Sequence, residues 1–203
     1  MSDFINPTPI AKRIVFADAN VLYSRVLRDY LLYAAIRKLI SIAWSKKVLE
    51  EVERNLLAKN PSFTAESAKR LSEKMTDTFP YAEINPNPEH YEQLSQLSFP
   101  DDDDRHVFAA AIAAEAGIIC TSNTKDFPAH IASDLGMQVM SPDELLYWLA
   151  SDNSVSMLDV HNTVVAAYRG SSSVDTLEAL RRAGASNTAD LLDELYREFY
   201  DSK

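Results

Sequence analysis

Several features that define large protein classes are missing from this chain of 203 residues. Its single cysteine, Cys120, cannot form an internal disulfide, which agrees with a reducing compartment. No apolar run approaches the roughly 18 residues that a membrane-spanning helix requires. Residues 1–7 have neither the basic start nor the long apolar stretch of a signal peptide. We therefore expect a cytoplasmic protein with no membrane partner.

The composition is that of a globular protein. Apolar residues make up 46% and charged residues 25% of the chain, which argues against long disorder and fibrous architectures. The length suits one medium domain, or one domain of roughly 150 residues with an appendage. The sequence contains no internal repeat and no low-complexity tract.

The charge is unevenly distributed along the chain. The net charge of −10 argues against nucleic acid, but residues 1–60 carry +4 and residues 61–203 carry −14. The basic first part could form a local phosphate-contacting surface. Because helix surfaces are routinely rich in lysine and arginine, a purely structural role for these residues is the alternative.

Four consecutive acids, Asp101 to Asp104, stand directly ahead of an apolar run with helical character at 105–114. Adjacent carboxylates repel one another, so a cluster fixed at a helix start requires a compensating positive charge, and a divalent metal is one candidate. The alternative is that these carboxylates cap free N–H groups and oppose the positive end of the helix dipole.

Segments with strand and helix character alternate along the first 150 residues. Short apolar runs predict strands at 10–16, 40–44, 81–84, 118–121 and 137–140. Helical spacing predicts one or two helices over 21–39 and further helices over 45–58, from Ser62 or Thr64 to about 78, over 105–116 and over 128–135. Another helix is predicted from Ser141, and a turn at 85–88. The alternation predicts an α/β fold with helices on both faces of a central parallel sheet. Ligands of such folds collect beyond the carboxyl ends of the strands.

The pattern changes near residue 150. The segments 155–168, 174–183 and 188–200 have helical character, and no strand signal remains. The polar stretch 151–154 is the natural boundary. We therefore predict one domain over 10–150 and a small helical C-terminal extension over 151–203.

Four acids border the predicted elements of the first domain. Asp18 ends the first strand, Glu51 lies two turns into a helix, Asp104 opens a helix, and Asp126 lies in the loop after the strand at 118–121. A doubly wound fold can bring all four to one edge of its sheet. Carboxylates with no cysteine and little histidine suit Mg²⁺ or Mn²⁺ rather than zinc. Two such ions can activate a water for in-line attack on phosphorus, so the pattern indicates phosphodiester hydrolysis.

Four segments, in this order, resemble the motifs of PIN-domain nucleases. They are Phe16-Ala17-Asp18-Ala19-Asn20-Val21-Leu22; Ser45 with Val48-Leu49 and Glu51; Asp104 ahead of His106-Val107-Phe108-Ala109-Ala110-Ala111; and Thr121-Ser122-Asn123-Thr124-Lys125-Asp126-Phe127-Pro128. The likeness covers residues 10–149 and implies a three-layer α/β/α PIN-like fold and a Mg²⁺- or Mn²⁺-dependent endoribonuclease. Many such domains are VapC-type toxins held inactive by a cognate antitoxin, and some carry a helical C-terminal extension. The resemblance thus also implies an RNA substrate, an antitoxin partner and a homodimer.

Carried over position by position, the resemblance makes four residues the metal-binding and catalytic acids: Asp18, Glu51, Asp104 and Asp126. Asn20 would orient Asp18. Glu50 is the adjacent rival of Glu51, but neighbouring helix residues point about 100° apart, so only one of them can face the site. The spacing from Ser45 favours Glu51.

The last motif departs from the common toxin pattern, which has an acid where Asn123 stands. Asp126 is then the expected fourth acid, in a loop that is one residue longer. Whether Asn123 or Asp126 completes the metal site stays open at this point. Asn20 and Asn123 are also weak candidates for contacts to substrate.

Basic and aromatic residues near the motifs have weaker assignments. Arg25 and Arg28, just beyond Asp18, are the candidates for contacts to RNA phosphates. His106 lies about 200° around its helix from Asp104, so we expect a packing or partner residue rather than a catalytic base. We interpret three tyrosines at helical spacing as core or dimer contacts rather than platforms for bases: Tyr23, Tyr30 and Tyr33.

Two other functions remain open. Residues 14–22 also resemble the first motif of haloacid dehalogenase-like phosphatases, in which Asp18 would be the nucleophile. Asn20 cannot protonate a leaving group as the acid expected at that position would. The other alternative is a PIN-like module that binds RNA or protein without cutting, which Asn123 and the overall acidity support.

Overall fold

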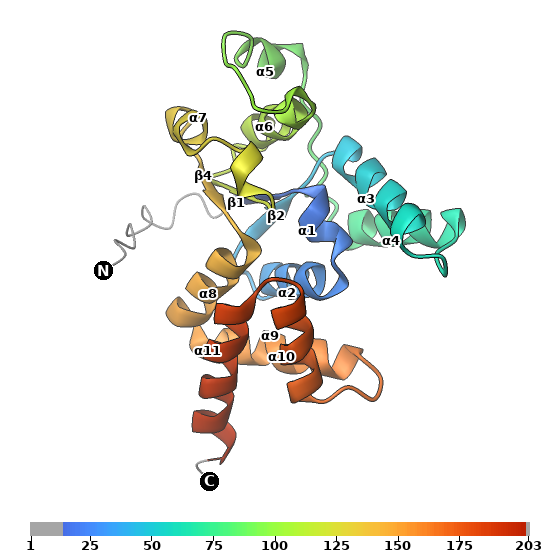
Figure 1. Ribbon diagram of the computed structural model, residues 1–203, viewed down its shortest axis with the longest axis vertical. Coiled ribbons are helices and arrows are strands. Elements are labelled where there is room, and N and C mark those ends of the chain that lie inside the picture. Colours follow the sequence, from blue (N-terminus) through green and yellow to red (C-terminus); the bar gives the residue numbers. More distant parts are fainter. Residues whose placement is uncertain (1–13, 202–203) are drawn as a thin grey trace.

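A sheet of four parallel strands forms the centre of the computed structural model, which describes residues 14–201 (Figure 1). The strands are β1 (Ile14–Ala17), β2 (Ser41–Ala43), β3 (Ile118–Cys120) and β4 (Gln138–Met140), in the order β2-β1-β3-β4. The two central strands, β1 and β3, are the most deeply buried, as expected for strands covered on both faces. The predicted parallel sheet is therefore confirmed, and residues 10–13 of the first predicted strand lie outside the described residues.

Helices cover both faces of this sheet. They are α1 (Ala19–Tyr23), α2 (Arg25–Ile36), α3 (Lys46–Lys59), α4 (Ala65–Thr78), α5 (Pro88–Glu92), α6 (Arg105–Ala113), α7 (Ala129–Asp134) and α8 (Pro142–Asp152). Two short 3-10 turns accompany them, η1 (Asp102–Asp104) and η2 (Thr124–Asp126). Figure 1 shows α6 and α7 on one side of the sheet and α1, α2 and α8 on the other. This is the predicted three-layer α/β/α fold.

Side-chain caps fix where the helices begin. The Ser45 hydroxyl accepts a hydrogen bond from the Val48 N–H at 3.3 Å, and Thr64 caps α4 in the same way. Ser141 and Glu144 form a reciprocal capping box at the start of α8, where Pro142 occupies the first turn. These caps confirm the predicted starts of three helices, and the first one orients the turn that carries Glu51.

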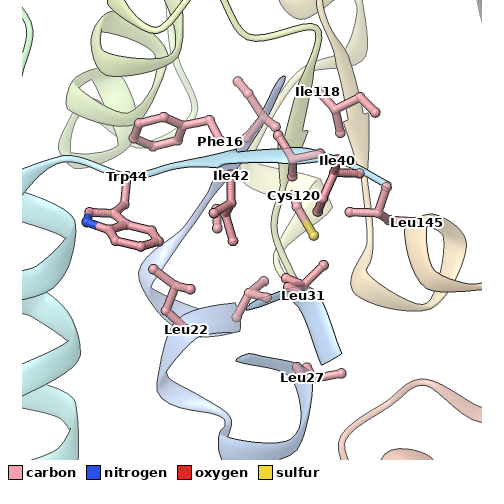
Figure 2. Packing of buried hydrophobic residues seen from close by; sticks show 14 of the residues in the cluster. Phe16, Leu22, Leu27, Leu31, Ile40, Ile42, Trp44, Ile118, Cys120 and Leu145 are labelled. Atoms are coloured by element: carbon pink, nitrogen blue, oxygen red, sulfur yellow. The ribbon is translucent and has the colours of Figure 1, made fainter. Parts of the chain in front are cut away.

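The apolar core locks the helices against the sheet. In Figure 2, Trp44 and Ile42 point from the β2 region toward Leu22 and Leu31 of α1 and α2, while Phe16 lies on the other side of the strand. All five are buried, and burying each such side chain stabilises the fold by about 1.5–3 kcal/mol.

A stacked pair of aromatic rings lies close in the chain to two of the acids. The ring of Phe108 in α6 stacks on the ring of Phe127, with 5.4 Å between the ring centroids. Phe108 follows Asp104 by about one turn, and Phe127 directly follows Asp126. The stacked pair therefore fixes the start of α6 beside the loop after β3.

The C-terminal helices share this core. They are α9 (Ser154–Ala167), α10 (Ser173–Arg182) and α11 (Ser186–Tyr196), followed by a π-helical turn at Arg197–Asp201. α9 packs on α2, and α11 packs on α8. Apolar residues of this part, including Met157, Val160, Val164 and Leu192, belong to the same continuous buried cluster as the strands. Residues 154–201 are helical as predicted, and they pack on the α/β part of the chain through a common core.

Two local predictions need correction. The expected strand at 81–84 is reduced to one isolated bridge between Trp44 and Glu83, and the expected turn at 85–88 opens into a short helix that Asn87 caps. The segment at 81–84 is thus joined to Trp44 by a single bridge and does not add a strand to the sheet. Within residues 14–201, no helix combines the length and apolarity needed to cross a bilayer.

Candidate metal centre

The strand register places Asp18 beside Thr121. Ala17 in β1 is the partner of Cys120 in β3, so the residue after each strand emerges at the same edge of the sheet. The Asp18 N–H donates to the Cys120 carbonyl at 3.0 Å. The Thr121 hydroxyl donates to Asp18 Oδ2 at 2.8 Å, and the Ala19 N–H donates to Asp18 Oδ1 at 2.6 Å. The Asp18 carboxylate is therefore held in one orientation.

Asn20 ties the two strand ends together. Its side-chain amide donates to Asp18 Oδ2 at 2.6 Å and to the Thr121 hydroxyl at 3.0 Å. Its amide oxygen accepts a hydrogen bond from the Ser122 N–H at 2.8 Å. These contacts suit the orienting role that the sequence suggested, since both polar ends of the amide are used within the protein.

The environment of Asp18 disfavours its ionised form. Asp18 is only 6% exposed, and this burial raises its pKa above the usual value. Hydrogen bonds from Thr121 and Ala19 lower the pKa, the charge of Glu51 raises it, and the net shift is upward. A nearby cation would favour the ionised form.

The structure assigns different roles to members of the acidic run. Asp101 caps the turn η1, where its carboxylate accepts a hydrogen bond from the Asp103 N–H at 2.9 Å. Asp102 pairs with Arg105 at 2.8 Å. Asp104 makes no capping hydrogen bond at the start of α6, and no ion pair or side-chain hydrogen bond links it to any described residue. Capping and pairing therefore account for the first two acids but for neither Asp103, which is exposed, nor Asp104, which is partly buried.

Asp104 carries an uncompensated charge. Partial burial, together with the charges of Asp18, Asp101 and Asp126, raises the pKa of Asp104 to about 6. The side chain of His106 opposes this rise. Carboxylates that follow β1 and that lie in η2 thus act on Asp104 of η1 at a single edge of the sheet.

Glu51 faces this edge from α3. Its Oε1 lies 3.1 Å from His106 Nε2, and its side chain is 23% exposed. Burial would raise the pKa of Glu51, but the hydrogen bond with His106 and the charges of His106, Lys47 and Arg54 hold that pKa below its usual range. Glu50, by contrast, is 61% exposed and lies 3.9 Å from Lys46, so the expectation that Glu51 faces inward agrees with the structure.

His106 is the residue that sequence reasoning underrated. It is 6% exposed, contacts Glu51, and lowers the pKa values of Asp18, Glu51 and Asp104 through its charge. It packs in the core as expected, but it also joins the acidic site. Helical phase relative to Asp104 could not reveal this contact, because the partner of His106 lies on a different helix.

The last motif places its acid close to the others. Asn123 donates its side-chain amide to the Asp126 carboxylate, and its backbone N–H donates to the Thr121 hydroxyl at 3.1 Å. Asp126 is partly buried, and its charge acts on Asp104. Of the two candidates, Asp126 therefore supplies the negative charge, and the amide of Asn123 positions the Asp126 carboxylate.

The family comparison agrees with this order of motifs. The sequence model of the PIN domain family matches residues 13–125, more than half of the chain. The chain belongs to the PIN domain family. PIN domains are generally nucleases and typically depend on divalent metals. The matched range contains Asp18, Glu51 and Asp104 and stops one residue before Asp126. Comparisons with curated proteins and with solved structures gave no significant match.

The acids of this PIN domain suit Mg²⁺ or Mn²⁺ in their chemistry. All four candidate ligands offer oxygen, and burial together with neighbouring carboxylates raises the pKa values of Asp18 and Asp104, which a bound cation would lower. Among residues 14–201, no three acidic, histidine or cysteine side chains are close enough to form a complete ligand set. Mg²⁺ keeps several waters and can be held by one or two carboxylates, so this spacing is compatible with it.

Of the two arginines expected to contact phosphates, one is buried and the other is exposed. Arg28 is 7% exposed and donates to the Leu22 carbonyl at 2.8 Å, so its assignment to RNA is wrong. Its guanidinium holds the junction of α1 and α2 because the end of α1 presents a free carbonyl there. Arg25 is 67% exposed, and its guanidinium lies over the ring of Tyr168. Arg25 remains available to a ligand.

Proposed function

We propose that this PIN domain is a Mg²⁺- or Mn²⁺-dependent endoribonuclease. The observation that carries the proposal is that the partly buried Asp104 carboxylate neither caps a helix nor pairs with a basic side chain. Burial and the charges of Asp18, Asp101 and Asp126 raise its pKa to about 6. Such a group costs a fold stability unless a ligand offsets its charge, and a bound cation would do so here.

The side chains divide the work of holding charge and placing water. Asp18, Asp104 and Asp126 would hold the cation, with Asp18 oriented by Asn20 and Thr121. Mg²⁺ held there would neutralise charge on the phosphate and would lower the pKa of a water for in-line attack. Glu51 stays ionised because its pKa is held low, so its carboxylate can accept hydrogen bonds from metal-bound or attacking water. By family resemblance, the products carry 3′-hydroxyl and 5′-phosphate ends.

Two adjacent substitutions test this site. Asp104→Asn should abolish cleavage of single-stranded RNA in the presence of Mn²⁺, and EDTA should do the same to the unchanged protein. Asp103→Asn is the matched control, because Asp103 is exposed and is not among the charges that act on Asp104. Undiminished cleavage by folded, pure Asp104→Asn protein would refute the proposed site.

We further infer that the nuclease is the toxin of a toxin–antitoxin pair and forms homodimers, as the VapC resemblance suggests. Expression in a bacterium should arrest growth and break RNA, and co-expression of the cognate antitoxin should relieve both effects. Expression of the Asp104→Asn protein should neither arrest growth nor break RNA. Growth arrest of equal strength from the variant would contradict a toxin that acts by cleavage.

Two alternatives give different results in simple assays. A non-catalytic RNA- or protein-binding module would show no carboxylate-dependent Mn²⁺ binding by calorimetry. A haloacid dehalogenase-like phosphatase would form a phosphoaspartate at Asp18 that mass spectrometry detects. The structure disfavours this second alternative, because Asp18 Oδ2 already accepts two hydrogen bonds and its neighbour Asn20 is an amide.

A further inference from the structure

We propose that RNA bound at the carboxylates continues along α1 onto a surface to which the C-terminal helices contribute. This surface, the basic–aromatic strip, consists of Tyr23, Arg25, Lys59, Tyr168 and Arg169. The inference rests on the proposed nuclease function and assigns the C-terminal helices a part in substrate binding. Tyr168 and Arg169 lie beyond residues 13–125, the range that the family model matches.

The strip begins where two helices lead away from the acids. α1 starts directly after Asp18 and ends at Tyr23, roughly 8 Å further along its axis. α3 carries Glu51 and ends at Lys59, roughly 12 Å further on. The Lys59 ammonium lies over the Tyr23 ring at 5.2 Å, and α1 and α3 pack against each other. Both helices therefore run from the acids toward the strip.

A hollow continues the strip at the junction of α2 and α9. It has a volume of about 520 Å³ and is lined by Arg25, Ala167, Tyr168, Arg169 and Ser171. The Arg25 guanidinium lies 4.3 Å from the centroid of the Tyr168 ring, and the arginine side chain is 67% exposed. The outer face of a guanidinium stacked in this way can receive a base, and its N–H groups can bind a phosphate.

Arg169 adds a second cation to this hollow. It is exposed at the rim of the hollow, and no ion pair or hydrogen bond engages its side chain within residues 14–201. The turn that presents it depends on Gly170, whose φ of +77° lies in the left-handed region. The Ser171 N–H then donates to the Tyr168 carbonyl at 3.0 Å, which closes the turn.

The local charge favours an anion despite the net charge of −10. The acid that faces the strip, Asp29, accepts a hydrogen bond from the Tyr168 hydroxyl at 2.9 Å. It also lies 3.8 Å from both Arg25 and Arg28. The Asp29 carboxylate is thus balanced by the buried Arg28, which leaves the exposed Arg25 and Arg169 to attract an anion. Alternating cations and aromatic rings are the surface that single-stranded RNA uses, with phosphates on the cations and bases on the planar groups.

Binding without cleavage tests this strip. Fluorescence anisotropy would follow a labelled single-stranded RNA of about ten nucleotides on protein carrying Asp104→Asn in EDTA, since one site of this kind covers about 4–16 nucleotides. Adding Arg169→Ala or Arg25→Ala should each weaken binding roughly fivefold to tenfold. Each should also reduce the slope of log affinity against log salt by about 0.7. Arg182→Ala is the matched control, because Arg182 is exposed at the far end of α10.

The outcomes separate this inference from the nuclease itself. Unchanged RNA affinity in both arginine variants would overturn the strip, even if the parent protein cleaves RNA. Weakened RNA binding in both variants, with Arg182→Ala unchanged, would support the strip even if the parent protein proved inactive. Weakened capture of the antitoxin with unchanged RNA affinity would also overturn it and would make the strip a protein-binding surface.

Discussion

The buried contact between His161 and Tyr30 predicts a loss of stability in mild acid. His161 lies in α9 with no exposed surface. Its Nδ1 contacts the Tyr30 hydroxyl of α2, and its Nε2 lies 2.7 Å from the Ser173 hydroxyl. Burial lowers the pKa of His161 to about 4, although the charge of Asp193 opposes the shift. The ring is therefore neutral where the C-terminal helices meet the PIN domain.

The magnitude follows from proton linkage. The unfolded chain binds the proton near pH 6.5, whereas the folded protein does not bind it until about pH 4, so protonation favours unfolding. The contribution of this histidine is fully present above about pH 6.5 and is lost progressively as the pH falls toward 4. A pKa shift of this size lowers the free energy of unfolding by about 2 kcal/mol when the pH falls from about 7.5 to about 5.

Urea denaturation at the two pH values measures this loss. His161→Gln should reduce the pH dependence of the free energy of unfolding by about 2 kcal/mol relative to the unchanged protein. The variant will be less stable at both pH values, so the comparison is made on the difference between them. His130→Gln is the control, since it removes a histidine from an exposed position on α7. The same pH dependence in His161→Gln as in the unchanged protein would refute the reasoning.

Three further predictions concern the acidic site. Asp104→Asn should raise the metal-free free energy of unfolding by about 1 kcal/mol, allowing for solvent screening, and should reduce the rise in melting temperature that Mn²⁺ gives the unchanged protein. His106→Ala should raise the pKa of Glu51 by removing its hydrogen bond and charge, which NMR titration of the glutamate would show as a higher midpoint. Phe108→Ala should cost about 3–5 kcal/mol in urea denaturation and weaken Mn²⁺ binding, because its ring holds α6 against Phe127.

Local signals predicted the positions of most helices and all four strands. Ser45, Thr64 and Ser141 are caps whose hydrogen bonds involve residues only three positions away, so the sequence itself contains both partners. Asp18 could be placed at a strand end because the apolar run before it stops there. Its contact with Thr121 depends on the pairing of β1 with β3, which the local pattern did not specify.

Contacts between helices were beyond such signals. The pairing of His106 with Glu51 joins α6 to α3, and nothing in the spacing of either helix encodes the other. The division of the acidic run likewise depends on η1, which turns Asp101 toward a backbone N–H and leaves Asp104 free of one. The burial of Arg28 was missed because a free carbonyl at Leu22 appears only where α1 ends.

The shared core changes how the C-terminal helices relate to the site. α2 follows α1 after a single residue, and α1 begins directly after Asp18, so a shift of α2 would be transmitted toward the carboxylate. α9 holds α2 at two places, through His161 on Tyr30 and through Tyr168 on Asp29 and Arg25. The second of these places lines the hollow of the basic–aromatic strip. A ligand that binds this strip would therefore also stabilise the packing of α9 on α2, and the affinity of the strip should weaken under acid conditions that protonate His161.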